Sequence, residues 1–134
     1  MKNAVEPNDD QINAFLAMGD APVYMVNLLK FREKANYPDG RDADISGREA
    51  YFRYAEPMTR LVLAAGGSLD FSGDVGGLLI GELDENWDMV AIMTYPSPKT
   101  LVDISLTPEF QEIAVHRKAG LEGQLLLPCR VPGR

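Results

Sequence analysis

The stretch Val23-Tyr24-Met25-Val26-Asn27-Leu28-Leu29-Lys30-Phe31 decides the fold. Apolar residues occupy nearly every position, and therefore both faces of an extended chain, which indicates a central strand covered on both sides. A second apolar run, Met89–Tyr95, leads into Pro96-Ser97-Pro98, where a serine cap is followed by a proline that favours the first turn of a helix. The two runs predict a domain that contains a β-sheet and helices.

Capping signals place three helices after the first strand. Ser46 and Glu49 form a capping-box pattern that opens a helix running to about Ala65 and ending at Gly66-Gly67. Ser97-Pro98 begins a short helix, and the same cap-proline pattern recurs ten residues later at Thr107-Pro108. The second half of the chain therefore holds two short consecutive helices.

The remaining segments complete the order of elements. The glycine-rich residues 67–82 predict one strand or two short ones, which form an antiparallel hairpin with residues 89–95, and residues 121–131 predict a last strand. Asn8 and Asp9 start a short N-terminal helix. The result is an α+β, ferredoxin-like βαββαβ domain with a four-stranded antiparallel sheet and an extra N-terminal helix. We expect a helical lead-in over residues 1–21, one domain over 22–131 and a tail over 132–134.

The pattern of the strands also predicts a partner. Helices on one face of such a sheet leave the other face uncovered, and strands that are apolar on both faces do not tolerate water there. A two-fold homodimer with the sheets packed face to face, a dimeric α+β barrel, is the simplest solution.

Composition excludes several classes. The chain has 134 residues and a formal net charge of −7, which would repel a nucleic-acid backbone, and no apolar run approaches the about 20 residues needed to span a bilayer. The early residues lack the apolar core of a secretory signal, and the single cysteine, Cys129, cannot form an intrachain disulfide. We expect a cytoplasmic protein that binds neither nucleic acid nor membrane.

Several motifs, in order, carry a resemblance to a known family. They are an acidic-tryptophan turn, a strand ending in aromatic-Pro-Ser, a Thr-Pro-Glu-aromatic helix start and an arginine near that helix's end, found here at residues 83–88, 90–98, 105–111 and 117–119. With these motifs the stretch from Val23 to Leu127 resembles the uncharacterised family catalogued as domain of unknown function 1330. The resemblance implies a dimeric α+β barrel, a group that includes small monooxygenases, isomerases and dehydratases. The Arg32–Asp44 loop and the N-terminal lead-in depart from the family pattern.

Two polar residues on apolar surfaces are the first candidates for ligand binding. Asn27 interrupts the first strand, and its amide needs several hydrogen-bond partners if it is buried. Arg117 shares a helical stripe with Phe110 and Ile113, from which a guanidinium group can clamp a carboxylate. The alternatives are a structural bond from Asn27 to a loop backbone, and a surface position or an acidic partner for Arg117.

The other candidates are weaker. Tyr51, Tyr54 and Tyr95 offer phenols to a pocket, or pack in the core. Lys30 and Arg32 follow the first strand and either attract an anion or are simply solvated. The sole histidine, His116, is the obvious base, although its spacing from Glu112 favours an exposed ion pair.

Two classes of function remain open. One histidine and one cysteine exclude the usual zinc and haem ligand sets within one chain, and no phosphate loop, nucleophile elbow or dinucleotide fingerprint is present, so no metal and no cofactor are expected. The first class is a cofactor-independent small-molecule enzyme or binder acting on a small organic acid or aromatic between sheet and helices. The alternative is a non-catalytic structural or regulatory homodimer whose polar groups satisfy one another.

Overall fold

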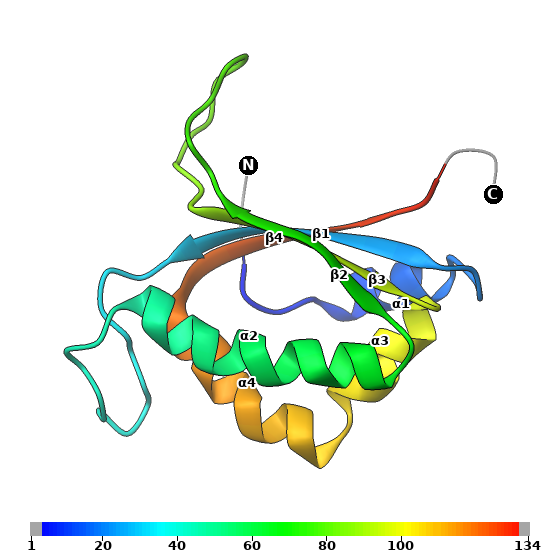
Figure 1. Ribbon diagram of the computed structural model, residues 1–134, viewed down its shortest axis with the longest axis horizontal. Coiled ribbons are helices and arrows are strands. Elements are labelled where there is room, and N and C mark those ends of the chain that lie inside the picture. Colours follow the sequence, from blue (N-terminus) through cyan, green and yellow to red (C-terminus); the bar gives the residue numbers. More distant parts are fainter. Residues whose placement is uncertain (1–3, 132–134) are drawn as a thin grey trace.

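The computed structural model describes residues 4–131, and the predicted 132–134 tail lies outside that range. Within residues 4–131, four strands and four helices form two layers, with the helices gathered on one side of the sheet (Figure 1). In chain order the elements are α1 (Asp9–Leu16), β1 (Val23–Phe31), α2 (Gly47–Ala64), β2 (Ser68–Asp74), β3 (Met89–Tyr95), α3 (Pro98–Ser105), α4 (Pro108–Gly120) and β4 (Leu121–Cys129). No helix among the described residues is both long and apolar enough to cross a bilayer.

The sheet has the order β2-β3-β1-β4, and each neighbouring pair is antiparallel. With α2 between β1 and β2, and α3 and α4 between β3 and β4, this is the ferredoxin-like arrangement, and the predicted α+β fold class is confirmed. The predicted N-terminal helix is present as α1. β1 is central, as its two-sided apolar sequence indicates.

Side-chain caps start the helices where the sequence predicts. Ser46 accepts a hydrogen bond from the Glu49 backbone, Ser97 from Thr100, and Thr107 from Phe110, while Asn8 forms a full capping box with Gln11. Each cap satisfies a backbone N–H that the first helical turn leaves unpaired. The caps therefore fix where the helices begin above the sheet.

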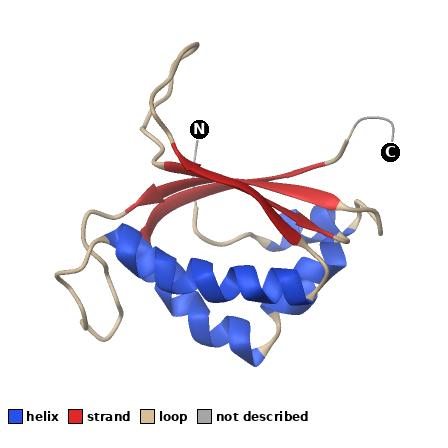
Figure 2. Cartoon of the chain, viewed as in Figure 1, coloured by secondary structure: helices blue, strands red, loops and turns tan. Residues whose placement is uncertain are grey.

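The two faces of the sheet differ in what covers them. Val23, Met25 and Leu29 of β1 point to the helices and are buried, whereas the alternating side chains Tyr24, Val26 and Leu28 are only half-buried. The strand pairings place Val90, Ile92, Phe71, Leu125 and Leu127 on that same second face. No helix of residues 4–131 covers this open face of the sheet (Figure 2).

α2 and α4 cross where two glycines meet. A Cβ atom on Gly120 would lie 2.4 Å from the Gly47 carbonyl oxygen and 2.6 Å from the Tyr51 nitrogen, distances that no real Cβ adopts. The Arg32 backbone lies at the same junction. Its N–H donates a hydrogen bond to the Gly120 carbonyl at 2.8 Å, and its carbonyl accepts one from the Gly47 N–H at 3.1 Å. Glycine is needed here for close approach of backbones.

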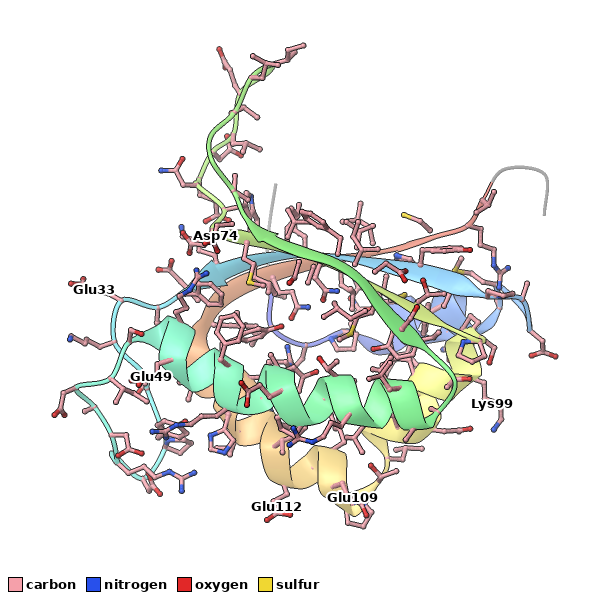
Figure 3. All side chains as sticks on the ribbon, viewed as in Figure 1. Glu33, Glu49, Asp74, Lys99, Glu109 and Glu112 are labelled. Atoms are coloured by element: carbon pink, nitrogen blue, oxygen red, sulfur yellow. The ribbon has the colours of Figure 1, made fainter. Side chains whose placement is uncertain are left out.

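Some local expectations need correction. The strand predicted over residues 67–82 ends at Asp74, and residues 75–88 form a long connection that stands away from the sheet (Figure 1). Cys129 is exposed in the single chain because it lies on β4 at the edge of the sheet. Glu109 and Glu112 point away from the body on the outer side of α4, while Asp74 marks the end of β2 (Figure 3).

Candidate functional site

A chain of hydrogen bonds links β1, β4 and α4 on the helix side of the sheet. The Arg117 Nη1 donates to Gln124 Oε1 at 2.9 Å, and Gln124 Nε2 donates to Asn27 Oδ1 at 2.8 Å. Asn27 Nδ2 in turn donates to the Met25 and Ala91 carbonyls at 3.3 and 3.2 Å. We call Asn27, Gln124 and Arg117 the relay. All three residues are half-buried, and the relay fixes the direction of the guanidinium group.

Three tyrosines share the interior that the relay borders. Tyr51, Tyr54 and Tyr95 are buried in the main core, and the rings of Tyr51 and Tyr54 lie 5.6 Å apart. The Tyr95 hydroxyl makes a long contact of 3.8 Å to the Met93 sulfur. Within the described residues, the hydroxyls of Tyr51 and Tyr54 have no hydrogen-bond partner. Two phenols thus keep unused hydrogen-bonding capacity inside an apolar layer.

Electrostatics connect these phenols to the relay. Burial raises the pKa of Tyr51, of Tyr54 and of Tyr95, which keeps all three neutral and able to donate near pH 7. The positive charge of Arg117 acts in the opposite direction on the pKa of Tyr51 and Tyr54. The Arg117 charge thus opposes the effect of burial on the pKa of both phenols but does not outweigh it. Of these four groups, Arg117 alone carries a positive charge, while the three tyrosines stay neutral because burial has the larger effect on their pKa.

An N-terminal strap runs along this region. We use the term for residues 4–8, which lead from the sheet edge to α1. The Ala4 backbone pairs with that of Gln124 in both directions, at 3.3 and 2.9 Å, and Val5 packs on the core. Glu6 forms an ion pair with Lys118, which lowers the Glu6 pKa through that bond and to a smaller extent through Arg117. The strap thus contacts the relay at Gln124 and lies near Arg117.

The structure brings five of the eight candidate residues into one region. These are Asn27, Arg117, Tyr51, Tyr54 and Tyr95. Sequence reasoning missed Gln124, although its position in the apolar run 121–131 carries the same signal as Asn27 in β1: a polar amide between apolar strand neighbours.

Lys30 and Arg32 lie elsewhere. Lys30 forms ion pairs with Glu85 at 3.1 Å and Glu122 at 3.3 Å, which raise its pKa. Arg32 sits at the glycine junction, and its buried Nε has no partner among the described residues. Neither residue belongs to the region around the relay.

His116 belongs to a separate cluster with the 32–46 loop. Its Nδ1 lies 2.7 Å from the hydroxyl of buried Tyr37, which also accepts a hydrogen bond from Arg53 at 3.2 Å. The expected ion pair with Glu112 is not formed within the described part of the chain, because the imidazole turns toward the loop instead. Burial lowers the pKa of His116, and the charges of Arg41 and Arg53 lower it further.

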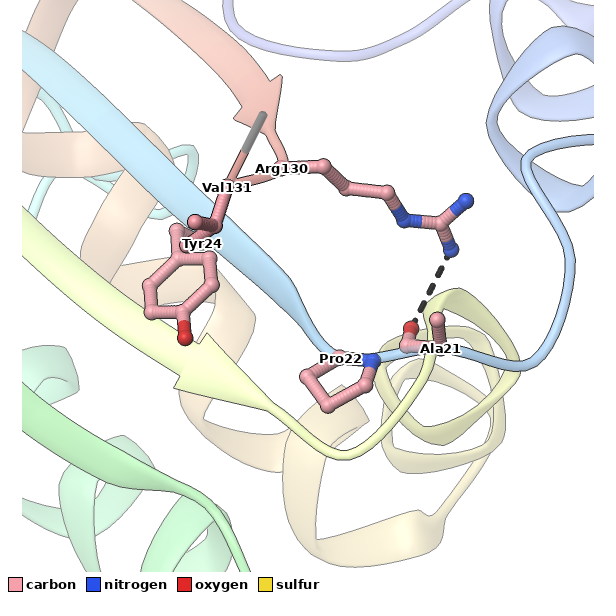
Figure 4. Close-up of a pocket in the computed structure, with 5 residues that line it drawn as sticks. All are labelled: Ala21, Pro22, Tyr24, Arg130 and Val131. Atoms are coloured by element: carbon pink, nitrogen blue, oxygen red, sulfur yellow. Dashed lines mark hydrogen bonds between the residues drawn. The ribbon is translucent and has the colours of Figure 1, made fainter. Parts of the chain in front are cut away.

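Two hollows lie away from the relay. One is a cavity of about 50 Å³ between the start of β1 and the end of β4, where Arg130 donates to the Ala21 carbonyl at 3.1 Å (Figure 4). The other is a shallow groove of about 400 Å³ between α2 and α4, lined by Leu61, Ala64 and Ile113 with Glu109 and Glu112 among its polar residues. Neither is lined by a residue of the relay or by one of the three interior tyrosines.

No family model matches this chain, and no curated protein matches it. Solved structures define its class: the protein is a ferredoxin-like α+β protein. A dimeric ferredoxin-like protein of unknown function from Jannaschia is 12% identical with a TM-score of 0.53, covering 83% of this chain and 100% of that one. A hydroxynitrile lyase from Passiflora edulis is 11% identical with a TM-score of 0.58, covering 87% and 98%. At these identities the similarity concerns the fold.

Two further solved structures show the family of this chain. Two crystal structures of RPA0582, a protein of unknown function from Rhodopseudomonas palustris, match with a TM-score of 0.87 and identities of 33% and 30%. The matches cover 100% and 99% of this chain, and 100% of RPA0582 in both cases. The chain belongs to the family of RPA0582.

Proposed function

We propose that the protein is a cofactor-independent small-molecule enzyme or binder whose ligand, a small organic acid or aromatic, lies between the sheet and the helices beside Arg117. One observation carries this proposal. Arg117 uses a single N–H donor on Gln124, and the nearby hydroxyls of Tyr51 and Tyr54 have no partner among the described residues. A guanidinium group has five donors, and polar groups in an apolar layer are costly to leave unpaired.

The groups suit a ligand that carries negative charge on oxygen. The free edge of Arg117 can pair with a carboxylate, while Tyr51 and Tyr54 are neutral donors because burial raises their pKa. The relay holds the guanidinium in place before the ligand arrives, which lowers the cost of binding. As a reaction, this arrangement supports stabilisation of an oxyanion or enolate rather than proton abstraction by histidine, since His116 is bonded to Tyr37.

A thermal-shift screen tests the proposal. Benzoate, other small carboxylates and phenols are added to wild type, to Arg117→Met and to Arg60→Met, whose arginine is exposed on α2 and serves as the charge-matched control. A ligand at 100 times its dissociation constant stabilises the fold by about 2.7 kcal/mol. We expect a carboxylate to stabilise wild type and Arg60→Met but not Arg117→Met. A screen in which no compound stabilises wild type contradicts the proposal.

The second candidate is a non-catalytic structural or regulatory homodimer. The observation in its favour is that Asn27, Gln124 and Arg117 bond to one another, as groups with a purely structural role do. The same screen separates the two readings. If the protein is a non-catalytic homodimer, no ligand stabilises wild type, and Arg117→Met only melts at a lower temperature than wild type.

We also propose that two chains associate by packing the open faces of their sheets. The half-buried apolar side chains of β1 and β3 on that face support this, and so does the dimeric state of the Jannaschia protein. Light scattering at micromolar concentration checks it, and a mass near 14.8 kDa would contradict it. Membership of the domain of unknown function 1330 family and a cytoplasmic location remain predictions from the sequence.

A further inference from the structure

The connection between β2 and β3 carries solvent-exposed aliphatic residues at the point farthest from the sheet. We call residues 75–88 the arm and Leu78-Leu79-Ile80 its tip. Leu79 and Ile80 are 96% and 85% exposed, and Leu78 is 53% exposed. The arm rises from the sheet on the side opposite the helices, which is the side of the open face (Figures 1 and 2).

The base of the arm is fastened to the body. Val75 donates to the Asp88 carbonyl at 2.9 Å, Asp88 donates to the Leu29 carbonyl at 2.8 Å, and the Asp88 carboxylate accepts from the Phe31 backbone at 2.8 Å. Trp87 is buried beside this base, and Glu85 pairs with Lys30. The body therefore sets the position and direction from which the arm leaves the sheet.

Residues 76–83 make no hydrogen bond with any other described residue, and a Cβ atom added at Gly76, Gly77 or Gly81 would meet nothing within 4 Å. Gly77 and Gly81 adopt φ values of 152° and 97° on either side of the tip, a backbone that glycine allows at low cost. Single exposed leucines are ordinary on protein surfaces, but three consecutive large aliphatic residues on a projecting arm indicate an interaction site.

We propose that the tip packs against a second copy of this chain, at the edge of the partner's sheet. This inference rests on the homodimer proposed above. Sheets packed face to face lie about 10 Å apart, and an extended chain rises about 3.3 Å per residue, so the five residues from Val75 to Leu79 carry the tip past the plane of the partner's sheet. Two-fold symmetry makes the contact reciprocal, so that each chain holds the other.

The surface between the open face and the tip supports this occupant. Phe71 lies on the open face at β2 and is 54% exposed, and Val75 follows it at the base of the arm. The apolar open face therefore continues onto the arm. Glu82 follows the tip closely, and an acidic residue there disfavours an anionic lipid surface as the alternative occupant.

A dilution series by analytical ultracentrifugation tests the inference. The tip variant is Leu79→Ser with Ile80→Ser, and the control is Leu63→Ser with Leu106→Ser, which removes two exposed leucines from the helical layer. We expect the tip variant to weaken dimerisation at least about tenfold, as loss of large aliphatic side chains from an interface does, and the control to leave it unchanged. Hydrogen exchange provides a second readout on wild type alone: amides 76–83 should gain protection in the dimer.

The outcomes separate the arm from the dimer. If wild type is monomeric at every concentration, the dimer and the arm contact both fail. If wild type and the tip variant dimerise equally and amides 76–83 exchange freely, the arm contact alone is refuted. Sedimentation with phosphatidylcholine–phosphatidylserine vesicles that depends on the tip, with dimerisation unchanged in the tip variant, would overturn the inference in favour of a membrane.

Discussion

Replacing Gln124 by leucine should destabilise the protein because it breaks both hydrogen bonds that join the three residues of the relay. The change removes the 2.8 Å bond to Asn27 and the 2.9 Å bond from Arg117. Leaving the Asn27 oxygen unpaired costs about 1–3 kcal/mol, and since Asn27 is half-buried we expect about 2 kcal/mol in total. Asn27→Leu alone orphans the Gln124 amide and should cost about 1–2 kcal/mol.

The double variant makes the prediction specific. When both partners become apolar, no donor or acceptor is orphaned between them, so the two changes together should cost less than their sum by about 1 kcal/mol. Urea unfolding, followed through the fluorescence of buried Trp87 at fixed protein concentration, measures the free energy of unfolding. Gln111→Leu, at an exposed amide on α4, is the control and should add to Asn27→Leu within about 0.5 kcal/mol. If the effects of Gln124→Leu and Asn27→Leu add as closely as those of the control pair, the hydrogen bond between Gln124 and Asn27 does not stabilise the fold, and the relay is refuted.

Three further predictions concern packing and ionisation. Gly120→Ala should destabilise by more than about 2 kcal/mol through its clash with the Gly47 carbonyl, whereas Gly76→Ala, which meets open space, should be nearly neutral; chemical denaturation of both variants checks this. The pKa of His116 is lowered in the folded state, so the unfolded state binds more protons just below pH 6.5. The contribution of His116 to stability is therefore complete above that pH and is lost as the pH falls. When the free energy of unfolding is measured across this range for wild type and His116→Gln, only wild type should lose stability through this group. Burial raises the pKa of Tyr51, Tyr54 and Tyr95, so their contribution to stability is complete below pH 10 and is lost as the pH rises above it. An ultraviolet titration checks this. If all five tyrosines of the chain ionise near pH 10 while the protein stays folded, the burial of these three is contradicted.

Local signals account for most of the fold that the sequence predicted. The caps at Ser46, Ser97 and Thr107 depend only on a side chain and a backbone N–H three residues on, so they are readable in the sequence and hold in the structure. The β1 run is equally local, and its bounds Val23–Phe31 agree with the prediction. The sequence wrongly predicts strand for residues 75–82 of the arm, because their apolar side chains are typical of a strand but do not reveal whether a neighbouring strand pairs with them.

The candidate site was less predictable because its contacts are distant in sequence. Asn27 and Gln124 are 97 residues apart, and only the pairing of β1 with β4 brings their amides together. Tyr37 and His116 are 79 residues apart, and the loop that carries Tyr37 has no periodicity from which its burial could be read. Residue type and face were readable for Asn27 and Arg117, but the partner of each was not.

Side-chain nuclear magnetic resonance during a benzoate titration tests the central claim most directly. The reporters are the Arg117 Nε–H signal, assigned by its loss in Arg117→Met, and the Gln124 side-chain amide that bonds to Asn27. If a small organic acid binds beside the relay, both signals should shift together and saturate, while the exposed Arg60 signal stays still. If both reporters remain unmoved up to the solubility limit of benzoate and of the other carboxylates and phenols in the screen, the relay is a structural support and no ligand site lies beside it.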